Sequence, residues 1–498
     1  MSRFLSRAAT LLSLLFAFTA AADDNSMPAA PAALSLDECI ARALVKNFDL
    51  KIQGFTTANA RESVQTAKAT YDPSFTVDLA RSLNQSAASG SKLDGTTVAG
   101  PRTDVTNGSV GASQKIVTGA TLALNSGLNK NYTNSSFSIL NPAYNGDVGL
   151  SITQPLLKNA GLTVNRAAIL NAEYELSRAN LSYRSRLLQV IHDTEFAYYN
   201  LVFAREQLQV KQLSLEAAQK LYDENQTRQQ TGVATNLDVL TAQVGVANAR
   251  NGVVQAEKTV HDAEDALLQV IGLTDFTTSL GPVHFEEFTE PVPTFDRSYQ
   301  LARNNDPEFL STQKLIEEFK LDVLTTKRNR LPELDLTGAG GYTSKQTSYD
   351  RALNRLPHGD GYNWQVDLSL TFPWGNRAGN AAYHTALNNL RSQQTALEQL
   401  DQALVVEVRT DVRTVTTNLD SVKISTLSAE LSEKQYELQK AKFDAGLSTS
   451  REVLQSQADL ENARLSELQA KVSLRQAVSN LHQVEGSSLE RYRVASPE

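Results

Sequence analysis

The side chains that could perform catalysis or hold a metal are scattered along this sequence. Catalytic and zinc-binding histidines usually occur at close, regular spacing, as in the His-Glu-x-x-His motif. The six histidines lack that spacing: they are His192, His261, His284, His358, His384 and His482. The run Gly338-Ala339-Gly340-Gly341 follows a predicted strand but opens no helix, which argues against a phosphate-binding loop. We therefore predict no enzyme activity, no metal site and no cofactor.

The chain contains an internal duplication. The segment Thr231-Gly232-Val233-Ala234-Thr235 has a counterpart in Ala445-Gly446-Leu447-Ser448-Thr449, and the two glycines are 214 positions apart. An acidic residue follows each glycine by six positions: Asp238 in the first copy and Glu452 in the second. Each copy lies between long stretches almost free of glycine and proline. A similarity at a constant offset predicts a repeated architecture.

The N-terminus has the features of a secretory signal peptide. Arg3 and Arg7 precede an apolar run that ends in small residues, so we predict that residues 1–22 are removed on export. The chain has a net charge of −8, which argues against a nucleic-acid partner. The one cysteine, Cys39, allows no intrachain disulfide, and we expect it to be buried as a small apolar side chain.

After the signal peptide, no stretch is apolar enough for a membrane helix, so an exported chain of this kind is either soluble or a β-barrel, whose strands show as alternating apolar and polar residues. The clearest alternation has one apolar face: Trp364, Val366, Leu368, Leu370, Phe372 and Trp374. Ten tilted strand residues rise roughly 25 Å, the height of an outer-membrane apolar band, and tryptophans favour the two membrane interfaces. Shorter alternations occur at 74–79, 148–153 and 333–337. A soluble sheet with one buried face is the alternative.

Each predicted strand adjoins a proline, and the prolines are Pro73, Pro155, Pro332 and Pro373. Because proline breaks helices and is tolerated at strand ends, these residues mark junctions between helix and strand. The first pair of junctions is twice as far apart as the second. The additional residues, 83–145, predict either an added hairpin or a structured external loop, and the sequence leaves this choice open.

The rest of the chain has helical patterns. Residues 164–230 contain no glycine or proline and would form a rod about 100 Å long, and 380–445 repeat this pattern. Shorter helices are predicted at 236–271 and 450–485 after the glycines, and at 36–70 and 296–330 before the strands. Polar rods of this length with narrow apolar stripes indicate coiled coils. The predicted fold is therefore mainly α, with duplicated long helical hairpins and four or more β-strands.

Four strands are too few to close a barrel, and an open sheet edge in lipid is strongly unfavourable. Several copies of the chain must therefore pool their strands, and three copies would supply about twelve. We divide the chain into a first repeat, 34–275, an interrepeat linker, 276–295, a second repeat, 296–485, and a tail, 486–498.

Over nearly all of its mature length, the sequence resembles the TolC-like outer-membrane efflux proteins. The likeness is carried by the repeated glycine turns, the junctions Gln154-Pro155 and Phe372-Pro373, and the paired openings Asn47-Phe48-Asp49-Leu50 and Asn305-Asp306-Pro307-Glu308. The resemblance implies a homotrimer with a twelve-stranded barrel in the outer membrane of a Gram-negative bacterium and a helical tunnel in the periplasm. It also implies docking to a periplasmic adaptor and an inner-membrane transporter, with a belt around the tunnel formed by 281–293 and the tail.

The resemblance also implies functional residues at the two turns. In this family the helical tips contact the adaptor, and the matching residues here are Gly232, Val233, Ala234, Gly446, Leu447 and Ser448. Acidic side chains constrict the family's closed mouth, so Asp238 and Glu452 are candidates for the pore constriction. The alternative is that they are solvated helix residues that offset the helix dipole. Phe443 matches an aromatic position near the second tip, but it lacks the hydroxyl group of a tyrosine.

The resemblance therefore predicts a passive exit duct for drug efflux or type I protein secretion. A trimeric coiled-coil adhesin is one alternative, although adhesin stalks usually carry a single barrel segment at one end of the chain. A secreted enzyme on a helical scaffold is the other alternative, and it lacks a recognisable site.

Overall fold

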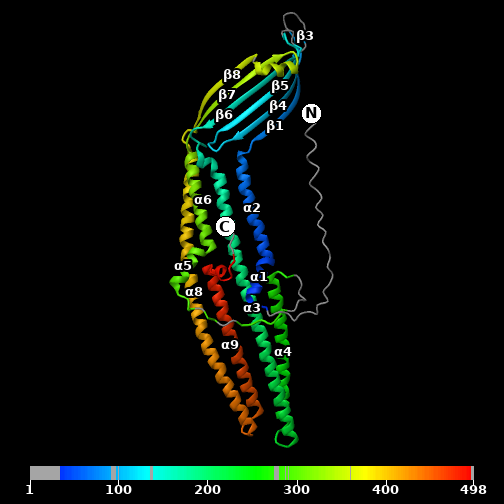
Figure 1. The fold of residues 1–498 in the computed structure, drawn as a ribbon, viewed down its shortest axis with the longest axis vertical. Helices are drawn as coiled ribbons and strands as arrows, with labels where there is room; N and C mark the ends of the chain where they lie inside the picture. The colour runs from blue at the N-terminus through cyan, green and yellow to red at the C-terminus, as the bar shows by residue number, and fades with distance from the viewer. Residues whose placement is uncertain are drawn as a thin grey trace, which may run out of the picture.

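The computed structural model describes residues 34–90, 97–98, 100–134, 138–273, 280–285, 288–289, 291–358 and 360–494. The predicted signal peptide, residues 1–22, lies outside these residues. The molecule is elongated, with a β-sheet at one end and two helical hairpins at the other (Figure 1). No described helix combines the length and the apolar character that crossing a membrane requires.

Two long helical hairpins form the end of the molecule opposite the sheet. The first consists of α3 (Leu162–Gln230) and α4 (Asn236–Ile271), and the second of α8 (Arg377–Asp444) and α9 (Ser450–Glu485). The 69 residues of α3 correspond to a rod of about 100 Å. α3 also packs against α9, which joins the two hairpins. The predicted duplicated hairpins are confirmed.

Four shorter helices pack alongside α3 and α8, on the part of the molecule nearer the sheet (Figure 1). They are α1 (Leu36–Lys46) and α2 (Phe48–Lys68) in the first repeat, and α5 (Phe295–Asn305) and α6 (Pro307–Asn329) in the second. The prediction of one continuous helix in each repeat was wrong. Asn47 ends α1 and caps α2 with its side chain, and Asp306 caps α6 just before Pro307, which has no N–H group to continue a helix.

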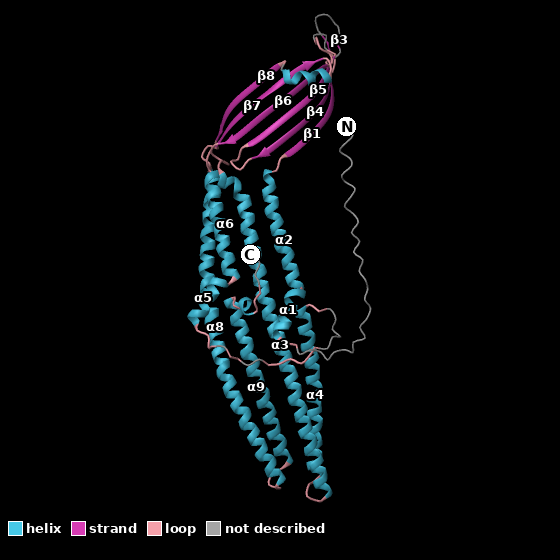
Figure 2. Ribbon diagram, viewed as in Figure 1, coloured by secondary structure: helices cyan, strands magenta, loops and turns pink. Residues whose placement is uncertain are grey.

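The sheet contains six long antiparallel strands in the order β1-β4-β5-β6-β7-β8 (Figure 2). Their bounds are β1 Ser74–Gln85, β4 Arg102–Lys115, β5 Thr121–Thr133, β6 Ala143–Pro155, β7 Glu333–Gln346 and β8 Gly361–Thr371. A short pair, β2 (Ser89–Gly90) and β3 (Thr97–Val98), extends the β1–β4 connection. The prediction of four or more strands per chain is confirmed, but twelve strands for three copies is too low, because each chain has six long strands. The additional residues form the hairpin β4–β5.

The register gives the sheet one apolar and one polar face. Leu124 lies opposite Leu150, and Leu336 lies opposite Leu368, on the same face as Val366. Most apolar side chains on this face are solvent-exposed in the single chain. The opposite face carries serine, threonine, asparagine and aspartate, including Asn107, Asn129 and Asn145, which are hydrogen-bonded across three strands. β8 ends at Thr371, so Phe372 and Trp374 follow the strand instead of belonging to it.

Aromatic side chains occupy both ends of the apolar face. Trp374 is 93% exposed near the helices, and its ring lies 6.4 Å from that of Phe372. At the far end the same face carries tyrosines and one tryptophan: Tyr132, Tyr144, Tyr342, Tyr362 and Trp364. Two aromatic bands that flank an apolar band are typical of a sheet that faces lipid.

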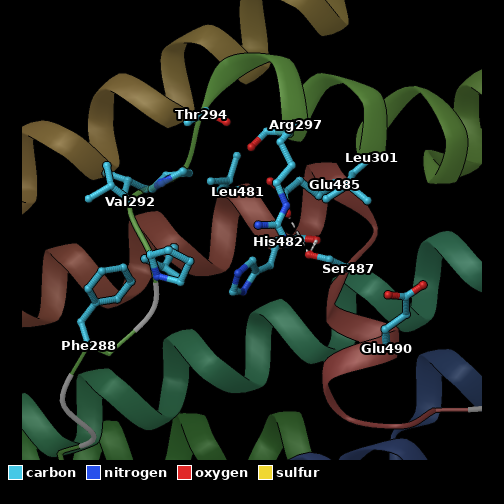
Figure 3. A pocket seen from close by; sticks show the side chains of 15 residues that line it. Phe288, Val292, Thr294, Arg297, Leu301, Leu481, His482, Glu485, Ser487 and Glu490 are labelled. Carbon is cyan, nitrogen blue, oxygen red and sulfur yellow. Dashed lines mark hydrogen bonds between the residues drawn. The ribbon is translucent and has the colours of Figure 1, made fainter.

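The largest core lies at mid-height, where chain segments pack across the helices. Tyr198 of α3 is buried, and its hydroxyl donates to the carbonyl of His284 in the interrepeat segment at 3.0 Å. Cys39 is fully buried in this core, and burial raises the pKa of its thiol to about 12. Next to the core, a cavity of about 330 Å³ brings together the interrepeat segment, α5, α9 and the start of the tail (Figure 3). The residues labelled there include Phe288, Val292, Arg297, Leu481, His482 and Glu485.

Candidate functional site at the helical tips

The two tips have the same backbone geometry. Gly232 has a φ of 77° and Gly446 a φ of 75°, a left-handed conformation that favours glycine. At the first tip, the N–H groups of Gly232 and Val233 donate to the carbonyls of Gln229 and Arg228. At the second, Gly446 and Leu447 donate to the corresponding carbonyls of α8. Both α3 and α8 therefore end in a Schellman motif.

The candidate constriction residues, Asp238 and Glu452, are the acidic members of two capping boxes. The Asp238 carboxylate accepts from the N–H of Thr235 at 2.9 Å, and the Glu452 carboxylate accepts from the N–H of Thr449 at 3.1 Å. The Ser448 hydroxyl also donates to Glu452, at 2.6 Å. Both acids therefore stabilise the start of a helix. A role in lining a pore stays a prediction.

These hydrogen bonds also determine the ionisation of the two acids. The side chain and the backbone of Thr235 hold the pKa of Asp238 below its ordinary value. The Ser448 hydroxyl, followed by the backbone of Thr449, likewise lowers the pKa of Glu452. Both carboxylates are therefore charged at neutral pH, which a cation-attracting ring would require.

A single arginine connects the two hairpins near the tips. Arg228, in the last turn of α3, donates from Nη1 to the carbonyl oxygen of Phe443 in α8 at 3.0 Å. Its guanidinium lies 4.1 Å from the centre of the Phe443 ring, and Nη2 lies 3.5 Å from a carboxylate oxygen of Asp444. One side chain thus makes a hydrogen bond, a cation–π contact and an ion pair with the other hairpin.

A buried contact supports this arginine. Leu221, Phe443 and Val453 form a small apolar cluster between the hairpins. Beside it, the fully buried side chain of Asn225 accepts a hydrogen bond from the Ser450 hydroxyl at 2.8 Å. A buried amide without a partner would be unfavourable, so this pair favours one alignment of α3 with α9.

The end surface of the tips is partly apolar. Val233 is 76% exposed and Leu447 is 79% exposed, and each follows its glycine directly. Ala234 and Ser448 are half-buried, and the Ser448 hydroxyl is engaged with Glu452. Among the described residues, no group of three or more His, Cys, Asp or Glu side chains is arranged to hold a metal ion.

The family model described as "Outer membrane efflux protein" matches residues 39–273 and 298–487.

The chain belongs to the outer membrane efflux protein family.

Two relatives show how far sequences have diverged within this family. The chain is 22% identical to the outer membrane protein TolC of Escherichia coli, over 57% of this chain and 59% of that protein. The aligned part thus spans less than two thirds of that relative. It is also 22% identical to the toxin and drug export protein A of Aggregatibacter actinomycetemcomitans, over 72% of this chain and 80% of that protein.

Solved structures are similar over most of the fold. The Campylobacter jejuni outer membrane channel CmeC has a TM-score of 0.66 and 17% identity, over 92% of this chain and 89% of that chain. The Vibrio cholerae outer membrane protein VceC has a TM-score of 0.66 and 16% identity, over 91% of this chain and 96% of that chain. This efflux family protein thus combines a helical tunnel segment with a barrel segment. It lies in the outer membrane of a Gram-negative bacterium and extends into the periplasm.

The sequence identified the tips of this efflux family protein but not the contact between them. Arg228 was missed because nothing along the chain shows that its side chain reaches Phe443, 215 positions away. The duplication partly indicated that a basic residue matters here, because the residue of the second repeat that is equivalent to Arg228 is Lys442, which is also basic. The pairing of Asn225 with Ser450 had no comparable signal.

Proposed function

We propose that this protein forms a homotrimeric channel that serves as the passive exit duct of a tripartite efflux pump or a type I secretion system. The observation that carries the proposal is the sheet: it has an apolar face, a polar face and two unpaired edges, β1 and β8. Unpaired backbone groups cannot remain exposed in lipid, so β8 of one copy must pair with β1 of the next.

Three copies with six long strands each supply eighteen strands. The polar face then lines the lumen, and the apolar face with its aromatic bands contacts lipid. Barrels of 16–18 strands are wide enough to leave an aqueous channel, so no large internal plug is required. In this arrangement the far end of the sheet, near Trp364, is extracellular, and the helices extend into the periplasm.

The trimer is tested by measuring the mass of the detergent-solubilised protein. We expect three copies per particle in outer-membrane extracts, and a matched measurement after cysteine pairs are placed across the β8–β1 contact should show covalent trimers under oxidising conditions. A stable monomer whose strands remain ordered would contradict the proposed closure.

We further propose that the tips bind a periplasmic adaptor, which connects the duct to an inner-membrane transporter. The support is the exposed apolar pair Val233 and Leu447 at the end of the tunnel segment. A photocrosslinking residue at Leu447 should capture the adaptor in cells. The same residue at Ile424, which is also exposed on α8 but lies farther from the tip, is the control. Equal capture at both positions would contradict end-on docking.

Docking must change the contact between the hairpins if it opens the channel. Arg228 holds the ends of α3 and α8 together in this conformation. We propose that opening separates Arg228 from Phe443 and Asp444, so that the two hairpins can move relative to each other.

A further inference from the structure

A short helix lies on the lipid-facing side of the sheet. α7 (Tyr349–Arg355), followed by the single turn Leu356–His358, connects β7 with β8 at the end far from the long helices (Figure 1). The Ser344 hydroxyl of β7 donates to the carbonyl of Ala352 at 2.6 Å. Gly146 of β6 permits this close packing, because an added Cβ would lie 3.3 Å from Leu356 and 3.4 Å from Ala352.

The side of the sheet that α7 covers is the apolar one. Gly146 lies opposite Ser344, in line with Val148, Leu150 and the tyrosines of the far aromatic band. The Tyr349 ring packs edge-on against Tyr144 of that band, with ring centres 4.6 Å apart. α7 therefore lies at the level where a bilayer changes from acyl chains to headgroups.

The two flanks of α7 differ in chemistry. Ala352 and Leu356 face the sheet and are buried. By helix geometry, Tyr349 and Leu353 then lie on one flank, and both are exposed. Arg351 and Arg355 are four residues apart, so they share the opposite flank, and both are exposed. An apolar flank opposite a cationic flank is typical of a helix that lies in a membrane interface.

The two arginines of α7 lie at the surface of the described part of the chain. Among the described residues, neither forms an ion pair with a carboxylate, and Arg351 donates a hydrogen bond from Nη1 to the Thr347 hydroxyl at 3.2 Å. Lys130 adds a third cation on the same face, 5.9 Å from the centre of the Tyr144 ring. Asp350 is the acidic residue of α7 and directly precedes Arg351, whereas Asp104 of β4 is paired with Arg81.

We propose that α7 is a docking surface for a phosphorylated lipid of the outer leaflet. Arg351 and Arg355 bind phosphate groups of the headgroup, and Leu353 and Tyr349 contact its acyl chains. Guanidinium groups suit phosphate because they donate two parallel hydrogen bonds. The inference rests on the proposed function, because it uses the proposed orientation of the barrel. Its test measures lipid binding and not transport, so a failure of the lipid site can be distinguished from a failure of the proposed function.

The experiment is a lipid titration of the detergent-solubilised protein, followed by native mass spectrometry. The probes are bisphosphorylated lipid A, monophosphorylated lipid A, phosphatidylethanolamine and inorganic phosphate. The wild-type protein should retain bisphosphorylated lipid A most tightly. A basic residue near an anionic lipid surface contributes about 1 kcal/mol, so Arg351→Gln and Arg355→Gln should each weaken binding about fivefold.

The matched control is Lys345→Gln. Lys345 lies next to Ser344 in β7, at the same height but on the polar face, so its loss should leave lipid binding unchanged. The proposal is overturned if the double arginine variant binds as the wild type does, or if Lys345→Gln weakens binding equally. It is also overturned if inorganic phosphate binds as tightly as the lipid. Should the glutamine variants fail to assemble, Arg351→Lys with Arg355→Lys must show a smaller loss, because charge is kept while the paired hydrogen bonds are lost.

Discussion

The two repeats of the chain agree at the helical tips and differ in the sheet. Both tips combine a Schellman motif with a capping box at equivalent residues. In the sheet, the first repeat contributes β1, β4, β5 and β6, whereas the second contributes β7 and β8. Between its outer strands the first repeat has the hairpin β4–β5, and the second has α7.

This contrast follows from the physical requirements of the two ends. A helical tip depends on a few local residues, because its Schellman motif and its capping box are formed by residues close together in the sequence. An antiparallel hairpin satisfies most of its own hydrogen bonds and presents a new edge of the same kind, so a sheet can accept one without rearrangement. The membrane end of a repeat can therefore diverge while its periplasmic end stays alike.

The largest effect is expected from deleting the β4–β5 hairpin, which the first repeat has and the second repeat lacks. Replacing residues 86–142 with an Asn-Gly turn joins β1 directly to β6 and gives both repeats two strands. Because barrel diameter grows roughly linearly with strand number, the barrel should narrow by about a third. Electron microscopy of the purified particles measures the diameter. Shortening the β2–β3 connection alone is the control, and an unchanged diameter in the full deletion would show that β4–β5 is no part of the wall.

The second test compares equivalent cations at the two tips. Arg228→Ala removes the contacts to Phe443 and Asp444, which together contribute about 1–3 kcal/mol. The ratio of closed to open channels should then fall roughly 5- to 150-fold, and resting conductance in planar bilayers should rise. Lys442→Ala, at the equivalent position of the second repeat, should leave conductance near the wild-type value. Equal effects of both changes would argue against a special role for Arg228.

The third test examines the shared turn geometry. At Gly446, a Cβ would meet no atom within 4 Å, so Gly446→Val is disfavoured by backbone strain alone, at about 1 kcal/mol or more. We expect intact trimers, a modestly lower melting temperature and weaker adaptor binding, with a similar result for Gly232→Val. Gly252→Ala, within α4, is the control and should be neutral or stabilising. Normal adaptor binding by Gly446→Val would mean that the tip is not the docking site.

The smallest effects are expected for the two capping acids. Asp238→Asn, Glu452→Gln and the double change should lower cation preference and weaken block by divalent cations in single-channel recordings. Because both pKa values are held below the ordinary range, block should persist from neutral to mildly acidic pH. Their depressed pKa values also mean that the capping contribution is present at neutral pH and is lost only as strong acid protonates these carboxylates. If selectivity and block are unchanged in the double variant, the acids serve only to cap their helices.

Local chemistry determined much of what the sequence predicted. The absence of glycine and proline over 164–230 indicated α3, because nothing in that stretch interrupts helical hydrogen bonding. Gly232 and Gly446 indicated the tips, and the alternation from Trp364 to Leu370 indicated β8 and its apolar face. β4 was missed because its outward positions include small and polar residues, such as Gly108 and Gln114, so that it lacks a clear apolar alternation.

Only the tertiary structure decided which distant groups meet. Arg228 meets Phe443 and Asn225 meets Ser450, and these pairings depend on how α3 packs along α9, the partner of α8 in the second hairpin. Likewise, the residues of α7 have no fixed environment until Gly146 and Ser344 bring the helix onto the lipid-facing side of the sheet. Helix periods, caps and turns depend on neighbours within a few residues and can be read along the chain. Contacts between separate elements depend on packing and register, which no local pattern records.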